Sequence, residues 1–145
     1  SCCGNEDLKL DHIQTYVDQC KEKASEHKSE SIKCVGETAG VSDADGKITD
    51  AAKYTELVAE MYTDDDLKAK VKEVAPTCIE KANTNNGKED KKGHKKMAVF
   101  GGFMCIKREV EKNCPEAKMV KNDMCQKMRE HIGKKGGGSS EETAA

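Results

Sequence analysis

The stretch Cys105-Ile-Lys-Arg-Glu-Val-Glu-Lys-Asn-Cys114-Pro115-Glu-Ala-Lys-Met-Val-Lys-Asn-Asp-Met-Cys125 places three cysteines in the last third of the chain, with a proline directly after the second. Further cysteines stand at positions 2, 3, 20, 34 and 78, which makes an even total of 8. None of them forms a Cys-x-x-Cys pair, and zinc sites usually require such closely spaced ligands. We therefore predict four disulfides in an oxidising compartment, with three bridges and one free pair as the alternative.

The composition explains why the chain needs such cross-links. Of 145 residues, 36% are charged, 35% are hydrophobic and 3% are aromatic, so the apolar core of a single domain must be thin. The formal net charge of −2 argues against a nucleic-acid-binding surface, which needs a clustered excess of lysine and arginine. No apolar run approaches the roughly 20 residues of a membrane span, so we expect no membrane insertion.

Apolar residues recur at helical spacing through the first half of the chain. The pattern predicts helices over 8–24, over 31–39, from Thr49 as N-cap through Tyr62, and from Thr63 through Ile79. Pro76 is expected to kink or split the fourth of these, because its ring removes a backbone hydrogen bond. Gly40 is typical of a helix C-terminus, and Asp45-Gly46 is typical of a turn.

The second half of the chain predicts two further helices after a polar loop over 83–96. The run from Met97 to Ile106 is apolar on all sides, which indicates a helix surrounded by the rest of the protein. Gly101 and Gly102 each cost that helix about 1 kcal/mol relative to alanine, a cost that close packing or room for a ligand would offset. Pro115 suits the first turn of a last helix.

These elements predict an all-α fold of about six helices, cross-linked by disulfides. We expect a single helical domain over 1–133 and a flexible, glycine- and serine-rich tail over 134–145. The chain begins at Ser1 without methionine, as a mature secreted protein would after removal of its signal peptide, although a recombinant start would look the same.

Local motifs indicate neither an enzyme nor a metal or cofactor site. The turn around Asp43 and Asp45 is similar to a calcium-binding EF-hand loop, but Val41 and Ala52 occupy the positions of its strongest ligands. No two of the four histidines lie four residues apart, and no nucleophile elbow, phosphate-binding loop or dinucleotide fingerprint occurs. We therefore expect no cofactor, no metal and no catalytic residues.

The 6 methionines are many for a small domain. Flexible thioethers either fill gaps in an ordinary core or line a cavity that adapts to ligands of different shape. Composition alone favours the ordinary core.

The spacing of the cysteines is similar to that in insect odorant-binding proteins, especially their extended plus-C branch. The arrangement Cys105-x8-Cys114-Pro115-x9-Cys125 looks like the plus-C pattern, and Cys2-Cys3 fits the additional N-terminal cysteines of that branch. The run Ile32-Lys33-Cys34-Val35, which leads through Gly40 to Ile48, resembles the family's helix end and turn, and Cys78 resembles its next cysteine.

The sequence departs from the family pattern at two positions. Glu30 stands where the first cysteine of a Cys-x-x-x-Cys unit is expected, and Lys95 or Lys96 stands where another is expected. The loss of both partners of one bridge resembles the minus-C branch and keeps the cysteine count even. By this analogy the bridges are Cys20–Cys34, Cys78–Cys105, and two that join Cys2 and Cys3 to Cys114 and Cys125 in an order left open.

The resemblance implies a secreted, extracellular carrier, without enzymatic activity, that binds odorants, pheromones or similar small hydrophobic molecules in an internal apolar cavity. It further implies a monomer or weak homodimer with a chemosensory receptor as a partner. The expected lining residues are Tyr54, Leu57, Val58, Met61, Val71, Val74, Val99, Phe100, Phe103, Met104, Val120 and Met124. The alternatives are a secreted metal-sequestering or antimicrobial protein, and an interaction module without a small ligand.

Overall fold

The structure, a computed structural model, describes residues 2–4, 8–26 and 28–135, so the predicted tail lies outside the described residues from 136 onward. The described part is all-α, which confirms the predicted fold class. Its elements are η1 (Asp11–Ile13), α1 (Gln14–Gln19), α2 (Lys21–Glu26), α3 (Lys28–Thr38), α4 (Ala51–Ala59), α5 (Asp65–Asn85), α6 (Ala98–Lys112), η2 (Glu116–Lys118) and α7 (Asp123–Lys135), where η denotes a 3-10 helix.

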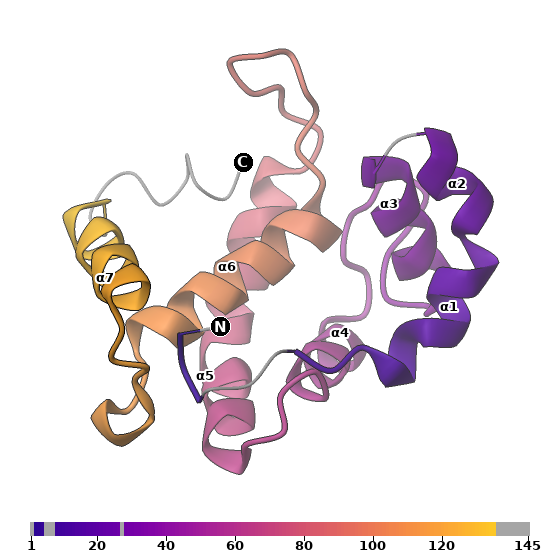
Figure 1. Cartoon of the computed structure of the whole chain (residues 1–145). Helices are drawn as coiled ribbons and strands as arrows, with labels where there is room; N and C mark the ends of the chain where they lie inside the picture. Colours follow the sequence, from indigo (N-terminus) through magenta and orange to yellow (C-terminus); the bar gives the residue numbers. More distant parts are fainter. Residues whose placement is uncertain (1, 5–7, 27, 136–145) are drawn as a thin grey trace.

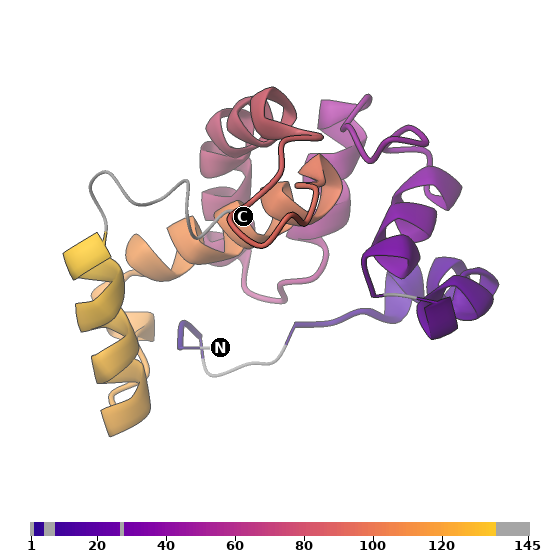
Figure 2. The same cartoon turned by 90° about the horizontal axis from the view of Figure 1, so that it is seen from above.

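The two long helices α5 and α6 form the centre of the molecule and pack more extensively on each other than any other pair of described elements. Figures 1 and 2 show α1, α2 and α3 grouped at one end of this pair and α7 at the other. Helix α4 packs against α5, and α3 reaches α6. The apolar core therefore lies where α4, α5 and α6 meet.

The four disulfides lie at both ends of this arrangement and in its middle. The bridge Cys20–Cys34 joins α3 to the residue after α1, and Cys78–Cys105 joins α5 to α6; these are the two pairs that the family analogy implied. The sequence left open how Cys2 and Cys3 pair with Cys114 and Cys125. In the structure Cys2 is bonded to Cys125 and Cys3 to Cys114. No described cysteine is free.

The N-terminal segment pairs with the chain between η2 and α7. Gly4 N donates to Lys118 O at 2.8 Å, and Val120 N donates to Cys2 O at 3.0 Å. An extended segment is needed for this pairing, so the last helix cannot begin at Pro115 as predicted. It begins at Asp123 instead, and Pro115 precedes the short η2.

Two further helix boundaries differ from the prediction for local reasons. The helix predicted over 8–24 is divided, because the backbone at Cys20 leaves helical geometry (φ −103°, ψ 11°) where its buried side chain forms a bridge. The N-cap of α4 is Asp50 rather than Thr49, since the Asp50 carboxylate accepts a hydrogen bond from Lys53 N at 3.0 Å.

Pro76 lies inside α5 and does not split it. The prolyl ring removes one helical hydrogen bond, but Pro76 is exposed, and the lost partner is the carbonyl of the equally exposed Lys72. The buried face of α5, which includes Leu67, Val71 and Ile79, keeps the helix continuous by packing on α4 and α6.

The turn predicted around Asp45-Gly46 holds the start of α6. Asp43 Oδ1 accepts hydrogen bonds from the backbone of Asp45 and Lys47, and Gly46 adopts φ +81°, which suits glycine. Val99 N then donates to Gly46 O at 2.9 Å. The first turn of α6 is thereby fixed to a loop more than fifty residues earlier in the chain.

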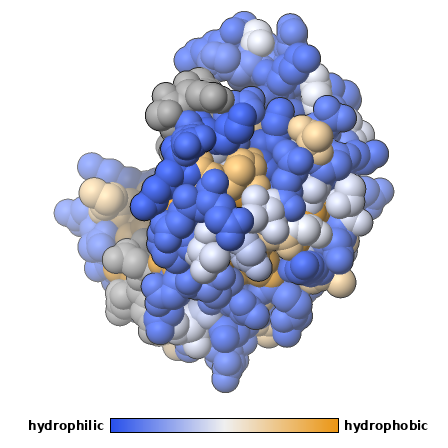
Figure 3. Space-filling view, turned by 90° about the vertical axis from the view of Figure 1, so that its right-hand side faces the viewer, coloured by the Kyte–Doolittle hydropathy of each residue, from blue (hydrophilic) through white to orange (hydrophobic). Residues whose placement is uncertain are grey.

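The surface reflects the high charge of the chain. On the side of α1–α3, Figure 3 shows mainly hydrophilic residues, with apolar residues visible only in small areas between them. No helix within the described ranges combines the length and apolar character that a membrane crossing requires.

Candidate ligand-binding site

Eight of the twelve predicted lining residues share one apolar cluster at the junction of α4, α5 and α6. Five of these are buried: Tyr54, Val58, Met61, Val71 and Val99. Leu57, Val74 and Phe103 pack against the cluster while remaining partly exposed.

The other four predicted residues lie outside this cluster. Phe100 and Met104 are half-buried on α6, and Val120 is half-buried in the extended segment before α7. Met124 lies on α7 with 79% of its surface exposed. The structure therefore does not bring Met124 together with the α4–α5–α6 residues.

Tyr54 is buried, and its hydroxyl already has a partner. Tyr54 Oη donates to the carbonyl of Val99 at 2.7 Å, and burial raises the pKa of the phenol far above its ordinary value, so it stays neutral. A Cβ atom at Gly102 would lie 3.0 Å from Tyr54 Oη and 3.1 Å from Ile48 Cδ1. Gly102 thus allows α4 and the 41–49 turn to approach α6 closely. Such close packing is one of the two features, beside room for a ligand, that were expected to offset the helix-propensity cost of Gly101 and Gly102.

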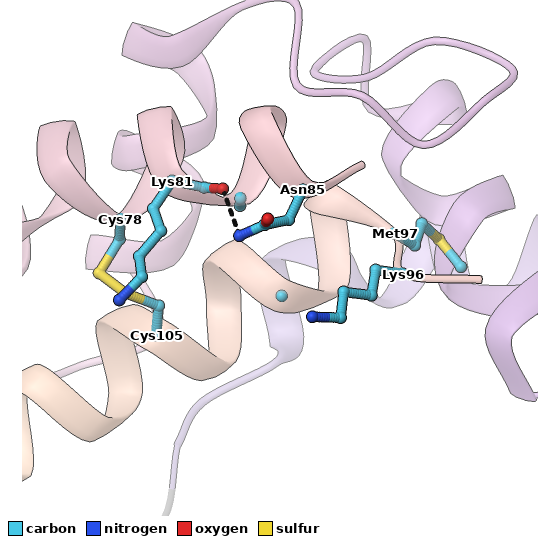
Figure 4. A pocket seen from close by; sticks show the side chains of 8 residues that line it. Cys78, Lys81, Asn85, Lys96, Met97 and Cys105 are labelled. Atoms are coloured by element: carbon cyan, nitrogen blue, oxygen red, sulfur yellow. Dashed lines mark hydrogen bonds between the residues drawn. A yellow bond between two sulfur atoms is a disulfide. The ribbon is translucent and has the colours of Figure 1, made fainter. Parts of the chain in front are cut away.

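Gly101, the neighbouring glycine, contributes to a pocket between α5 and α6 (Figure 4). The pocket has a volume of about 10 Å³, the space of about one water molecule. Its lining residues are Cys78, Lys81, Ala82, Asn85, Lys96, Met97, Gly101 and Cys105. None of these eight is among the twelve predicted residues.

The pocket is lined by both apolar and polar residues. The Cys78–Cys105 disulfide, Ala82 and Gly101 are apolar. In Figure 4 the Lys81 side chain extends from α5 toward the disulfide. An apolar lining with a few polar groups is the usual composition of a small-molecule site.

Lys96 lies at the opposite end of the pocket, beside Met97 (Figure 4). The amide of Asn85 is the third polar group of the lining: its Nδ2 donates to Lys81 O at 3.1 Å and its Oδ1 accepts from Lys88 Nζ at 3.4 Å. The lining contains two ammonium groups and no carboxylate.

The wall of the pocket that carries Lys96 is a hairpin formed by residues 87–96. Gly87 N donates to Lys96 O at 2.8 Å, and Lys96 N donates to Lys88 O at 2.8 Å. At its tip, Asp90 Oδ1 accepts hydrogen bonds from the backbone of Lys92 and His94, and these bonds lower the pKa of the Asp90 carboxyl. Helix α5 continues to Asn85 rather than ending at Ile79, so residues 83–85 of the polar loop predicted over 83–96 are helical, and residues 87–96 form an internally hydrogen-bonded hairpin.

Asn86 ties the base of this hairpin to the rest of the fold. Its Oδ1 accepts from Ala98 N at 2.8 Å, and its Nδ2 donates to Asp45 O at 3.3 Å. Because Ala98 is the first residue of α6, Asn86 joins the pocket wall to the start of that helix. We expect loss of this side chain to loosen the segment that contains Lys96 and Met97.

A larger depression of about 370 Å³ lies on the surface beside α3. Its lining includes two lysines and two glutamates, among them Lys33 and Glu30, whose charged atoms are 3.7 Å apart. Such a mixed-charge lining offers little apolar surface to a hydrophobic ligand. The pocket between α5 and α6 is therefore the better candidate.

Sequence reasoning missed the pocket because its lining is mostly polar or cysteine. Two signals pointed toward it: the unexplained Gly101 in an apolar helix, and Lys96 at one of the positions where a family cysteine is absent. Within the described ranges, no group of three or more histidine, cysteine, aspartate or glutamate side chains is arranged to hold a metal ion.

Comparison with known proteins identifies one family. A model described as the PBP/GOBP family matches residues 1–109, about three quarters of the chain. The matched part ends inside α6, so Cys114 and Cys125 lie beyond it. No curated protein and no solved structure matches the chain.

Proposed function

The chain belongs to the PBP/GOBP family, the insect odorant- and pheromone-binding proteins, and we propose that it carries a small hydrophobic molecule bound between α5 and α6. Proteins of this family are carriers without enzymatic activity, in agreement with the prediction from the sequence.

The observation that carries this proposal is the continuity of the pocket with the apolar core. Cys78 and Cys105 belong to the core cluster, and Ala82 and Met97 pack against it. An apolar ligand that enters between α5 and α6 therefore meets apolar side chains in the direction of α4. Tyr54, Val71 and Val99 lie in that cluster and remain candidate contacts.

The affinity expected from such burial is moderate. Each buried methylene contributes about 0.8 kcal/mol, so about ten of them supply about 8 kcal/mol before the cost of association is subtracted. That free energy corresponds to a dissociation constant of about 1 μM or weaker. A carrier that must release its ligand is compatible with this range.

Binding requires the pocket to enlarge, because about 10 Å³ does not admit a volatile molecule. The wall best suited to move is the segment with Lys96 and Met97, since both are only half-buried and Met97 has a flexible thioether. Asn86 is one of the groups that hold this wall in place, because its Oδ1 accepts a hydrogen bond from Ala98 N. We infer that ligand entry displaces Met97 and the adjoining leg of the hairpin.

We further propose that the protein acts outside the cell, as a monomer or weak homodimer, and delivers its ligand to a chemosensory receptor. Its four disulfides support an oxidising compartment.

Two neighbouring glycines provide a matched test. Gly101 lines the pocket, so we expect the methyl group added in Gly101→Ala to reduce its volume, whereas in Gly102→Ala the added methyl group meets Tyr54. We expect Gly101→Ala to weaken binding of the fluorescent probe N-phenylnaphthylamine by about tenfold or more, a loss of about 1.4 kcal/mol. Gly102→Ala should retain more of the affinity and lose thermal stability. Equal probe binding by native protein and both variants would contradict the proposed site.

A further inference from the structure

We propose that the tip of the 87–96 hairpin is a cleavage site for an extracellular serine protease that cuts after lysine, and that the cut loosens the wall of the α5–α6 pocket. Water adds across the peptide bond after Lys91 or Lys92, which leaves a carboxylate on one side and an ammonium group on the other. The step needs no other reactant. The part of this inference that concerns ligand release rests on the proposed function.

The first argument is the exposure of the tip. Figure 1 shows the chain between α5 and α6 projecting away from the helices. Residues 91–95 are all exposed, and two of them, Lys91 and Lys92, are consecutive lysines. Exposed loop tips with small and polar residues are the preferred sites of proteolytic nicking.

The second argument is the low cost of opening the tip, because cleavage requires the chain around the broken bond to fit an enzyme cleft in extended form. The tip is held by its own residues: the Asp90 carboxylate accepts from Lys92 N and His94 N, and the Asp90 carbonyl accepts from Gly93 N. Within the described core, no residue from 88 to 95 takes part. Opening therefore exposes no apolar core, and such segments open with the lowest free energies.

Other lysines are held more firmly. Lys53 and Lys72 are exposed but lie within α4 and α5, where cleavage would require a packed helix to unwind. Lys96 is half-buried, and its N–H and its carbonyl are both bonded within the hairpin. Lys118 lies in a segment bonded to the N-terminus, since its carbonyl accepts from Gly4 N. We therefore expect the first internal cut at the hairpin tip.

The third argument is that disulfides hold the two products together. Three of the four bridges join residues before the tip to residues after it: Cys2–Cys125, Cys3–Cys114 and Cys78–Cys105. The cut protein therefore keeps α5 packed on α6. The pocket wall changes instead, because its leg with Lys96 is no longer closed to Lys88 through the tip, and a two-stranded pair without that closure is at best marginally stable.

The test digests the delipidated full chain with trypsin at a low enzyme ratio and follows the products by mass spectrometry. The first internal cut should add the mass of one water and leave a single species, which separates after Lys91 or Lys92 only when the disulfides are reduced. Loss of residues after Cys125 leaves every bridge intact and is recognised by its mass. In the cut protein, the Lys96 amide should exchange faster, and bound N-phenylnaphthylamine should be released about threefold faster or more.

The double variant Lys91→Gln/Lys92→Gln removes the cleavage site and retains the backbone hydrogen bonds of the tip. We expect cleavage of its hairpin to slow and its probe affinity to stay unchanged, since neither residue lines the pocket. Lys53→Gln/Lys72→Gln is the control, and its hairpin should be cut as fast as that of the native protein.

The outcomes separate this inference from the proposed function. A first internal cut within a helix or after Lys96, equal cleavage of the hairpin in the double variant, or a cut protein with unchanged Lys96 amide exchange or probe release would overturn the inference and leave the carrier intact. Failure of the probe to bind to folded, uncut protein would overturn the proposed function, while the cleavage position and the amide exchange would still decide this inference.

Discussion

Tyr54 Oη donates a hydrogen bond of 2.7 Å to the carbonyl oxygen of Val99, and this bond joins α4 to the first turn of α6. The same turn is held by Gly46 O, which accepts from Val99 N, and by Asn86, which accepts from Ala98 N. The beginning of α6 is therefore fixed from three sides. Met97, the residue just before it, borders the pocket.

Tyr54→Phe removes the hydroxyl from this contact and leaves the buried ring in place. We expect a loss of about 1 kcal/mol in the free energy of unfolding, the usual net value of a buried hydrogen bond. Urea unfolding followed by circular dichroism would measure it. Tyr16→Phe, a variant at a partly exposed position on α1, is the control and should change stability less.

The two N-terminal disulfides are expected to stabilise the fold in a non-additive way. Cys3–Cys114 and Cys2–Cys125 close nearly the same long loop, so either one alone keeps the chain ends together. When one of these two bridges is already formed, the second bridge adds only a small ring, which consists of Cys2, Cys3 and residues 114–125. The chain-entropy model gives about 3 kcal/mol for such a ring and about 5 kcal/mol for the long loop.

Removal of both bridges by cysteine-to-alanine pairs should therefore cost about 2 kcal/mol more than the sum of the two single removals. Denaturant unfolding of the three variants tests this relationship. Strict additivity would show that the two bridges constrain independent parts of the chain.

The ion pair between Asp64 and Lys118 predicts a dependence of stability on pH. The hydrogen bond from Lys118 holds the pKa of the Asp64 carboxyl below its ordinary value of 3.8, and the same contact raises the pKa of Lys118. The Asp64 carboxyl has a lower pKa in the folded protein than in the unfolded chain, so its ionised form stabilises the fold. This stabilisation is fully present at pH values above the unfolded-state pKa and is lost as the pH falls through the folded-state pKa. Stability should accordingly fall as the pH drops below about 4.

Asp64→Asn isolates this effect, because asparagine keeps the N-cap hydrogen bonds to Asp66 N and Leu67 N. We expect the variant to be less stable than the native protein at neutral pH and to approach it in acid. Asp65→Asn in the same helical turn is the control. A constant difference in the urea midpoint between native protein and Asp64→Asn at every pH would contradict the assignment.

Asn86→Ala tests the movement of the pocket wall. Loss of its bonds to Ala98 N and Asp45 O should loosen the 87–96 hairpin, speed amide exchange there and accelerate ligand release. Stopped-flow displacement of the probe measures the release rate. Asn83→Ala is the matched control, since Asn83 holds Ile48 through two hydrogen bonds and does not line the pocket. It should lower stability without selectively accelerating release.

Much of the fold could be predicted from the sequence because helical periodicity and cysteine spacing are local signals. The all-α class, the α6 helix and the turn at Asp45-Gly46 follow from patterns within a few residues. The order of the Cys2 and Cys3 bridges could not be predicted, since adjacent cysteines have nearly the same reach along the chain. It depends on the antiparallel pairing of the N-terminal segment with residues 118–120.

The candidate site was only partly predictable for a similar reason. Apolar periodicity identified the core residues of α4, α5 and α6, such as Val58 and Val71, because burial determines that pattern. The pocket depends on contacts between the hairpin and two helices, and its lining includes Lys81 and Lys96, a residue type that is normally exposed. Among the residues that line the pocket, Gly101 was indicated in advance, together with its neighbour Gly102, by an unfavourable helix propensity.

Amide NMR spectra of the delipidated protein during a titration with lauryl alcohol would show whether a ligand binds between α5 and α6. We expect saturable shifts concentrated on residues 78–85 of α5 and on residues 96–105, which lead into and begin α6, with smaller shifts in the core residues of α4. Shifts confined to the α1–α3 end, or none in a protein whose spectrum shows it to be folded, would show that the ligand does not bind there.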